Sequence, residues 1–319
     1  MLKLSPVMFR FYGINLCYAS AEIDYITGTT CQIFQNQFIV CDKSVRLYGS
    51  YLLIGGRILR GRKRIGGYGG DFVAGFIQSD DFHAVFRIRP QGAVYRVDTA
   101  SLKVEAKVTV GYQPDELTVL GEYLYVANSG GYRAPDYDNT VSVIELERFK
   151  QVQKIPVGIN LHRIRADKYG KLWVTSRGDY NTIHSNLYVL EKRPGYTEMV
   201  VTDTLNIPCS NLWIDDDCLY YYSTEWNNNT QSNTIGYGVI DIRTKKVIRD
   251  SFISDGTEKD IKIPYGIAVH PVTKDIYVTD AKNYVSSGTL YCYDQDGFQK
   301  WGVRTGDIPA HMVFVNKEE

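Results

Sequence analysis

VSVIE (residues 141–145) is one of five copies of a short alternating strand that ends in an acidic residue. The other copies, VYRVD, LYVLE, YGVID and LYCYD, end at Asp98, Glu191, Asp241 and Asp294. Successive acids are 47, 46, 50 and 53 residues apart, an interval too regular to arise by chance. A fixed spacing of this kind indicates a series of similar structural units.

Each copy is accompanied by three further strand-like segments. The copy ending at Glu145 is followed by KQVQKIPV from residue 150, and is preceded by YLYVAN from residue 123 and DELTVL from residue 115. Such segments alternate apolar and polar residues, are separated by Gly, Asn, Asp and Pro, and show almost no helical periodicity. Four short strands in about 49 residues are typical of a β-propeller blade, and blades close into a ring that removes their edges.

The repeat predicts an all-β protein whose whole chain forms one closed propeller domain. The length of 319 residues corresponds to seven blades, or to six with a long N-terminal extension; we predict seven, regular over residues 92–319. Residues 1–91 match poorly, and only VRLYGSYLLIGG (45–56) aligns with a blade segment, LTVLGEYLYVAN (117–128). Residues 57–70 show no strand alternation, which leaves a basic insertion loop, a decayed blade or a stretch translated out of frame as explanations.

The composition is that of a charge-balanced globular protein. Hydrophobic residues make up 44% and charged residues 23% of the chain, which excludes disorder. The 36 basic and 36 acidic residues cancel, so no overall field attracts nucleic acid, and we predict no such partner. No stretch approaches 18 apolar residues, so we expect no transmembrane segment. The 25 tyrosines favour strands and aromatic binding surfaces.

No motif for catalysis or metal binding stands out. The five histidines never form H-E-x-x-H, and G-x-S-x-G and C-x-x-C are absent. The glycine-rich GGYGG at residues 66–70 lacks the lysine and the following helix of a phosphate-binding loop. We therefore predict no catalytic residues, no metal and no cofactor. Cys209 and Cys218 could form a disulfide in an oxidising compartment.

Long loops are predicted on one face of the propeller. Because the strands of a blade are antiparallel, the loop between its second and third strands opens on the same face as the connection to the next blade. The former loops span residues 129–139, 177–185, 224–236 and 281–288, longer than a hairpin requires, which indicates function or mobility. Their aromatic residues lie beside polar groups, an arrangement that suits a large polar small molecule or a glycan.

We predict that the ligand-binding residues come from these loops and connections. They are Tyr112, Tyr132, Arg133, Tyr137, Asp138, Arg177, Tyr180, Trp226, Asn227, Tyr265, Tyr284 and His311, and Asn160, His162 and Asn211 lie near the same rim. The alternative for any single aromatic residue is that it covers a strand end and packs on its neighbours without contacting a ligand.

A family resemblance is carried by the second strand of three blades. Tyr125-Val-Ala-Asn128, Trp173-Val-Thr-Ser176 and Tyr277-Val-Thr-Asp280 resemble the YVTN repeats of surface-layer-type, YncE-like β-propellers. The resemblance covers residues 92–315 well and residues 45–56 weakly. Such propellers include proteins of unknown role, relatives of quinoprotein dehydrogenases, and Bacteroidetes-type cell-surface lipoproteins that capture cobalamin.

The resemblance implies a non-enzymatic cell-surface propeller that binds a corrinoid or another large polar ligand and passes it to an outer-membrane transporter. It also implies export to the cell surface or periplasm, often with a lipid anchor, although the N-terminus here matches an export signal poorly. Two alternatives stay open. One is a metal-dependent lactonase or hydrolase, with a divalent cation near Asp138, Asp179, Glu225 and Asp280; the other is a protein-interaction scaffold.

Overall fold

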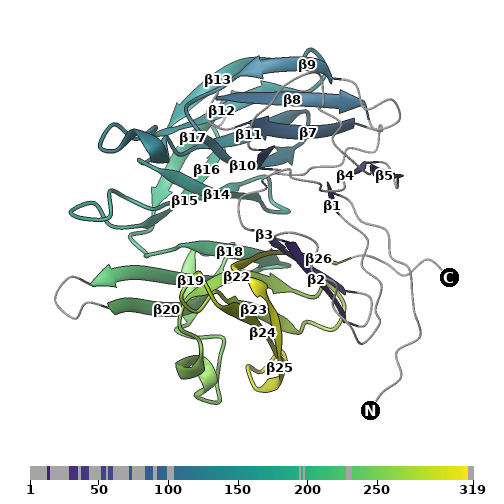
Figure 1. The fold of residues 1–319 in the computed structure, drawn as a ribbon. Coiled ribbons are helices and arrows are strands. Elements are labelled where there is room, and N and C mark those ends of the chain that lie inside the picture. Colours follow the sequence, from purple (N-terminus) through teal and green to yellow (C-terminus); the bar gives the residue numbers. More distant parts are fainter. Residues whose placement is uncertain are drawn as a thin grey trace.

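The computed structural model describes residues 92–98, 104–193, 195–196, 198–227 and 232–314, together with seven short strands between residues 13 and 88. In this part of the chain five four-stranded antiparallel sheets follow one another along the sequence (Figure 1). The architecture is a β-propeller, as predicted. The blade number of seven stays a prediction. The division of the chain into a poorly matching region before residue 92 and regular blades after it also stays a prediction.

In each of these sheets the strands lie side by side in chain order. The first sheet contains β6 (Phe72–Val73), β7 (His83–Ile88), β8 (Ala93–Asp98) and β9 (Val104–Thr109). The second contains β10 (Pro114–Leu120), β11 (Tyr123–Asn128), β12 (Thr140–Glu145) and β13 (Lys150–Pro156). The third contains β14 (Leu161–Ala166), β15 (Leu172–Ser176), β16 (Asn186–Lys192) and β17 (Met199–Thr204).

The last two four-stranded sheets continue the pattern. One contains β18 (Asn211–Asp215), β19 (Cys218–Asn227), β20 (Ser232–Asp241) and β21 (Lys246–Arg249). The other contains β22 (Pro264–Val269), β23 (Ile276–Asp280), β24 (Ser287–Tyr293) and β25 (Gln299–Asp307). The described connections include two 3₁₀ turns, η2 (Gly131–Arg133) and η3 (Thr257–Asp260). Within the described residues no helix has the length and apolar character needed to cross a membrane.

The first strands of the second to fifth sheets lie on the inside of the propeller. β10 packs against β14, β14 against β18, and β18 against β22, so these strands surround a common axis. β22 in turn packs against β26 (Pro309–Phe314). The residues that begin these innermost strands are therefore brought to one end of the axis, although they are far apart in the sequence.

The last described strand lies in one sheet with two strands from the N-terminal part of the chain. β26 pairs antiparallel with β3 (Gln37–Asp42), which pairs with β2 (Thr29–Phe34). Pairing of strands from the two ends of the sequence order covers an edge that would otherwise be exposed. A second N-terminal sheet joins β1 (Gly13–Ile14), β4 (Leu52–Ile54) and β5 (Arg57–Leu59).

The N-terminal predictions are tested only in part. β4 falls within the predicted strand at residues 45–56, whose first seven residues lie outside the described part. β5 shows that residues 57–59 form a strand, although the sequence there lacks alternation. Residues 60–70 lie outside the described residues, and the three explanations for this stretch stay open.

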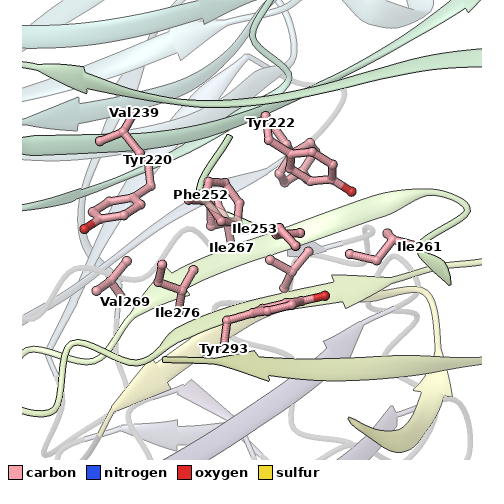
Figure 2. Packing of buried hydrophobic residues seen from close by; sticks show 12 residues of the cluster. Tyr220, Tyr222, Val239, Phe252, Ile253, Ile261, Ile267, Val269, Ile276 and Tyr293 are labelled. Atoms are coloured by element: carbon pink, nitrogen blue, oxygen red, sulfur yellow. The ribbon is translucent and has the colours of Figure 1, made fainter. Parts of the chain in front are cut away.

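The core lies between neighbouring sheets and contains one repeated aromatic position. In the aligned segments YLYVAN, KLWVTS, CLYYYS and DIYVTD the third residue is Tyr125, Trp173, Tyr220 or Tyr277, and all four side chains are buried. Figure 2 shows one such interface, in which Tyr220 packs together with Phe252, Ile276 and Tyr293. Burying large aromatic side chains between blades contributes apolar area to the stability of this architecture.

The predicted loop at residues 224–236 is wrong in extent. β19 and β20 continue their pairing to Asn227 and Ser232, so residues 224–227 and 232–236 belong to strands, while residues 228–231 lie outside the described part. The asparagines suggested a loop because asparagine favours turns. The β-branched and aromatic residues on either side of the asparagines, such as Thr224, Trp226 and Ile235, instead support a strand extension.

The disulfide considered between Cys209 and Cys218 is also absent, since both are free thiols. In the hairpin of β18 and β19, Asp215 pairs with Cys218 at one end and Asn211 with Tyr222 at the other. Cys209 precedes Asn211 and therefore lies at the opposite end from Cys218. Burial raises the pKa of the Cys209 thiol far above its usual range, which makes this residue unreactive.

Candidate functional site

The two ends of the propeller differ in how their charges are paired. At one end lie the loops at residues 110–113, 129–139, 157–160, 177–185 and 281–286, which we call the loop face. The turns at the other end, which we call the turn face, carry ion pairs between neighbouring sheets. Examples are Lys168 Nζ with Asp217 Oδ1 at 3.0 Å and Lys274 Nζ with Asp215 Oδ2 at 2.8 Å. In these pairs each charge is neutralised by its partner, so they offer little charge for a ligand.

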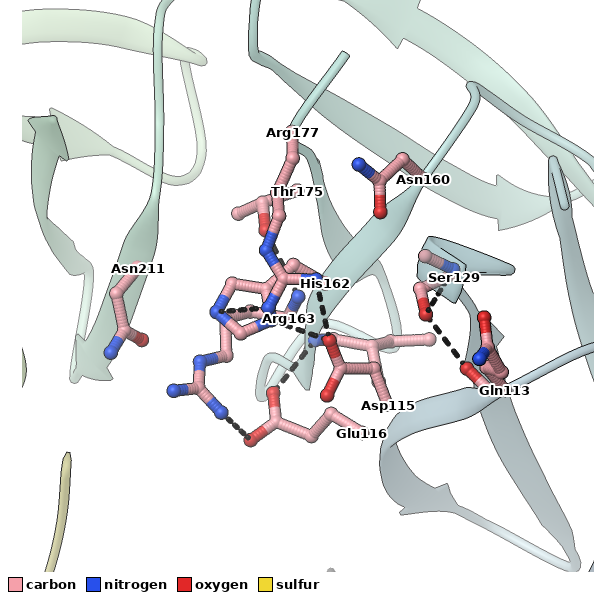
Figure 3. Close-up of polar contacts among 12 residues, drawn as sticks. Gln113, Asp115, Glu116, Ser129, Asn160, His162, Arg163, Thr175, Arg177 and Asn211 are labelled. Carbon is pink, nitrogen blue, oxygen red and sulfur yellow. Dashed lines mark hydrogen bonds and ion pairs between the residues drawn. The ribbon is translucent and has the colours of Figure 1, made fainter. Parts of the chain in front are cut away.

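The loop face instead holds a compact charged group near the axis, shown in Figure 3. We call it the axial cluster; its members are Asp115, Glu116, His162, Arg163, Arg165 and Arg177. The two acids come from the start of β10, and the remaining residues come from β14 and the residue after β15. The cluster therefore joins two neighbouring sheets at the axis.

Local irregularities of the innermost strands direct these side chains. The pairing of β10 with β11 shifts register between Pro114 and Glu116, and that of β14 with β15 shifts between Leu161 and Ile164. Such bulges redirect side chains and are frequent beside functional sites. A similar shift in β22 occurs between Pro264 and Gly266, on either side of Tyr265. The bulges thus place Asp115, His162, Arg163 and Tyr265 at the same end of the axis.

One half of the axial cluster orients Arg177. Asp115 Oδ2 lies 2.8 Å from an Arg177 guanidinium nitrogen and 2.8 Å from His162 Nδ1. Burial alone would lower the pKa of Arg177, but the Asp115 carboxylate outweighs burial, and the pKa is raised. Burial, together with Arg177 and Arg163, holds the pKa of His162 well below 6.5 against the opposing effect of Asp115. At neutral pH, Arg177 is therefore a fixed cation beside a neutral imidazole.

The other half centres on Glu116. Its Oε1 lies 2.8 Å from an Arg165 guanidinium nitrogen, and its Oε2 accepts a hydrogen bond of 2.9 Å from the Ile164 backbone N–H. Burial would raise the pKa of Glu116, but Arg165, Arg163, the Ile164 N–H and His311 together lower it to about 2. Arg163 contributes only a long contact, 3.4 Å from its Nη1 to Glu116 Oε1.

Three predicted tyrosines lie close to Arg177. Tyr180 and Tyr265 both interact electrostatically with Arg177, and the Tyr265 and Tyr284 rings meet edge to face with centroids 5.7 Å apart. Burial, and then the neighbouring Tyr265 and Tyr180, raise the pKa of Tyr284. These tyrosines come from the third and fifth four-stranded sheets, which are not adjacent in chain order. The structure therefore brings Arg177, Tyr180, Tyr265 and Tyr284 together.

A second group of predicted residues gathers where the loop at residues 129–139 meets the connection at residues 110–113. The Arg133 guanidinium stacks on the Tyr112 ring at 3.8 Å from its centroid, while Tyr132 is 80% exposed and Tyr137 is half-buried. Asp138 accepts hydrogen bonds from the Tyr112 and Thr140 backbone N–H groups at 2.7 and 3.0 Å. Asp138 therefore stabilises this loop, and contact with a ligand stays a prediction for all five residues.

The remaining predicted residues are Trp226, Asn227 and His311. Trp226 is exposed near the end of β19, and the side chain of Asn227 lies outside the described part. His311 is exposed on β26 and interacts electrostatically with Glu116, so it lies on the axial side.

The prediction from sequence missed Asp115, Glu116, Arg163 and Arg165. It searched the loops for aromatic residues, whereas these four residues lie within strands. The signal that could have identified them is the occurrence of charged pairs at the start of otherwise apolar innermost strands, in DELTVL and HRIRAD. A charge on a strand expected to be buried needs a partner.

The four acids proposed for a metal-dependent hydrolase do not converge. Asp179 accepts hydrogen bonds within its own loop, Glu225 accepts them from Ser185, and Asp280 accepts them from the Ile263 and Lys282 backbone N–H groups. Among the residues that the structure describes, no group of three or more His, Cys, Asp or Glu is placed to hold a metal ion. No observation in this part of the chain favours the hydrolase alternative.

The loop that carries Arg177 depends on Gly178, which gives a testable prediction. Gly178 has φ +65°, and a Cβ there would lie 1.8 Å from the Ile183 carbonyl oxygen. Gly170 has φ +80°, but a Cβ there would meet no atom within 4 Å. Gly170→Ala is therefore a control that measures backbone strain without a steric clash. We expect Gly178→Ala to lower the free energy of unfolding by at least about 1 kcal/mol more than Gly170→Ala. Urea unfolding measures both; equal losses would show that the loop at residues 177–185 adapts freely.

Comparison with known proteins supports the fold alone. No family model matches the sequence, and no curated protein matches it either. Hydrazine synthase from Kuenenia stuttgartiensis is similar over 87% of this chain and 80% of its own, with a TM-score of 0.63 and 16% identity. A quinoprotein alcohol dehydrogenase-like protein from Bacteroides thetaiotaomicron is similar over 90% of this chain and 68% of its own, with a TM-score of 0.53 and 12% identity.

A third similar structure is the Dos1 propeller, with a TM-score of 0.50 and 13% identity over 71% of this chain and 59% of that chain. At identities this low, structural similarity shows a shared architecture but does not show a shared activity. Membership of the YVTN-repeat family stays a prediction.

Proposed function

We propose that this β-propeller is a non-enzymatic protein that binds a large polar ligand at the axial end of its loop face. The observation that carries the proposal is the position of Arg177, which is oriented by Asp115 and lies among Tyr180, Tyr265 and Tyr284. An oriented guanidinium beside aromatic rings offers directional hydrogen bonds together with flat apolar surface. This combination suits a large, flat, polar molecule.

Preorganisation would be the source of affinity. The Asp115 carboxylate holds Arg177, and the edge-to-face contact of Tyr265 with Tyr284 limits the motion of both rings. Side chains that are already ordered lose little conformational entropy when a ligand binds. No covalent step is needed, and the ligand would leave unchanged.

The most specific form of the proposal is the capture of a corrinoid at the cell surface or in the periplasm, for transfer to an outer-membrane transporter. The resemblance of the second strands to YVTN repeats supports this form, and the aromatic surface near Arg177 is compatible with a macrocycle. A glycan is the other ligand class that such a surface accommodates.

Titration with cobalamin and cobinamide, followed by quenching of Trp and Tyr fluorescence, tests the proposal. We expect saturable quenching, and we expect Tyr180→Ala to weaken binding about fivefold to tenfold through the loss of one stacking side chain. Tyr196→Ala is the matched control, because Tyr196 is exposed to a similar extent, 60% against 66%, but lies on the turn face of the same sheet.

Two outcomes would contradict the proposal. Absence of quenching in the folded wild-type protein would reject the corrinoid. Binding of the protein to a glycan array would then test the broader proposal of a large polar ligand. Equal weakening by Tyr180→Ala and Tyr196→Ala would show that quenching does not report binding at the loop face.

A further inference from the structure

Arg163 is a buried cation with weak pairing. Its side chain is 6% exposed, and its Nε has no hydrogen-bond partner among the described residues. In this part of the chain the only carboxylate within ion-pair distance is that of Glu116, at 3.4 Å. Glu116 Oε1 is already shared with Arg165 at 2.8 Å, and Oε2 is occupied by the Ile164 N–H. A guanidinium carries five N–H donors, so one long contact satisfies Arg163 poorly.

The charges of the axial cluster do not balance. Three guanidiniums, those of Arg163, Arg165 and Arg177, face two carboxylates, those of Asp115 and Glu116. His162 does not change this count at neutral pH, because its imidazole is uncharged there. Counted over the residues that the structure describes, the cluster therefore carries one excess positive charge, and Arg163 is the member whose pairing is weakest. Buried charges are normally paired, so the described residues leave the cluster short of one negative charge.

The surroundings of Arg163 provide a second group of polar contacts. Tyr222 is close enough to Arg163 to interact electrostatically, and its hydroxyl oxygen accepts a hydrogen bond of 3.3 Å from Asn211 Nδ2. Asn211 begins β18, the innermost strand of the next sheet. In the view of Figure 3 the Arg163 guanidinium extends away from His162 toward the side on which Asn211 lies. A group bound to Arg163 would thus lie between β14 and β18.

We propose that Arg163 binds a singly charged oxyanion group of the ligand, a carboxylate or a phosphodiester. The inference rests on the proposed function, since it concerns the same axial end of the loop face. One excess positive charge matches a monoanion, whereas a phosphate dianion would leave a buried negative charge uncompensated. The planar guanidinium fork matches two oxygens of either group in a bidentate arrangement.

Thermal unfolding in small anions tests this inference without the natural ligand. Sodium acetate and sodium dimethyl phosphate are compared with sodium chloride at equal ionic strength and neutral pH. We expect at least one of the two oxyanions to raise the Tm saturably, by about 2–4 °C at tenfold excess over its Kd. The anion that stabilises more strongly identifies a carboxylate or a phosphodiester as the preferred group.

Arg163→Met is the decisive variant. It removes a poorly paired charge while Glu116 keeps Arg165 and the Ile164 N–H, so we expect a Tm in chloride equal to or above that of the wild type. We expect this variant to lose the stabilisation by oxyanions. Arg163→Lys keeps the charge but not the fork and should retain the fold with a response weakened at least about fivefold. Arg243→Met, at an exposed arginine of the turn face, should respond like the wild type.

The inference is wrong if neither oxyanion stabilises the wild type more than chloride does, or if Arg163→Met keeps the response. It is also wrong if Arg163→Met lowers the Tm in chloride as much as removal of the Glu116 charge does, because Arg163 would then be a structural ion-pair partner. Corrinoid titration and oxyanion stabilisation are independent readouts. Failure of the first with success of the second would reject the corrinoid and keep the oxyanion site.

Discussion

Replacing Glu116 with glutamine is expected to lower the free energy of unfolding by about 3 kcal/mol at pH 7. The Glu116 side chain is 7% exposed and is the shared counter-charge of Arg165 and Arg163. Glutamine has nearly the same shape but no charge, so it leaves both guanidiniums of this half of the cluster uncompensated. Breaking a buried ion pair by removing one partner is among the most destabilising substitutions.

The pH dependence of this effect is a sharper test than its size. The pKa of Glu116 is lowered from 4.5 to about 2 in the folded protein. Because the folded-state pKa lies below the usual value, the stabilisation is complete above pH 4.5 and is lost as the pH falls toward 2. The difference in unfolding free energy between wild type and Glu116→Gln should therefore be constant near neutral pH and shrink across this acidic interval.

Glu191→Gln provides the control. Glu191 pairs with Lys245 and Lys171 on the turn face and is 31% exposed, so we expect its loss to cost less than about 1 kcal/mol. Urea unfolding at a series of pH values gives the free energy of unfolding against pH for the wild type, Glu116→Gln and Glu191→Gln. A Glu116→Gln curve that runs parallel to the wild type down to pH 2 would contradict the assignment of Glu116 as the buried counter-charge.

The opposite change in stability is expected when Arg163, the partner of Glu116 in the contact at 3.4 Å, is replaced by methionine. Removal of Glu116 worsens the charge imbalance of the axial cluster, whereas removal of Arg163 relieves it. A symmetric structural ion pair would instead be destabilised by either substitution. The pair of variants thus separates a stabilising salt bridge from a cation that is held for a ligand, the kind of cost to stability that functional sites often carry.

Trp173→Ala is expected to lower the free energy of unfolding by about 3–5 kcal/mol. Trp173 is fully buried between the sheets of β14–β17 and β18–β21, where it packs with Leu212 and Tyr221. Its indole N–H donates a hydrogen bond of 2.9 Å to Asp167 Oδ2, and Asp167 Oδ1 accepts bonds from the backbone of the turn that follows β14. The substitution therefore creates a cavity and leaves a buried carboxylate oxygen without its donor.

Two further variants separate these contributions. Trp173→Phe removes the donor but keeps most of the volume, and we expect a loss of about 1–3 kcal/mol. Tyr196→Ala, at an exposed position, should change stability by less than about 0.5 kcal/mol. Far-ultraviolet circular dichroism in urea follows unfolding without relying on the tryptophan that is replaced. A loss below about 1 kcal/mol for Trp173→Ala would show that the blades do not depend on this repeated aromatic position.

The sequence by itself determined the architecture, because the signals for a blade are local. Alternation over a few residues, turn residues between strands and an interval of about 49 residues are all visible in one dimension. Every predicted strand from residue 93 to residue 307 is present, including those that carry Tyr125, Trp173 and Tyr277. The order of strands in each sheet follows directly, because neighbouring strands in the chain pair with one another.

Only the tertiary structure decided where the site lies and how it is charged. Asp115 meets His162 across 47 residues of sequence, and the meeting depends on bulges in two different strands. The loop prediction at residues 224–236 failed for a related reason, since cross-strand pairing outweighed the turn preference of asparagine. The net charge of zero likewise hid the excess positive charge that the described residues of the axial cluster carry. Charge summed along a chain says nothing about which charges are buried together, and burial is what makes a poorly paired guanidinium a binding group.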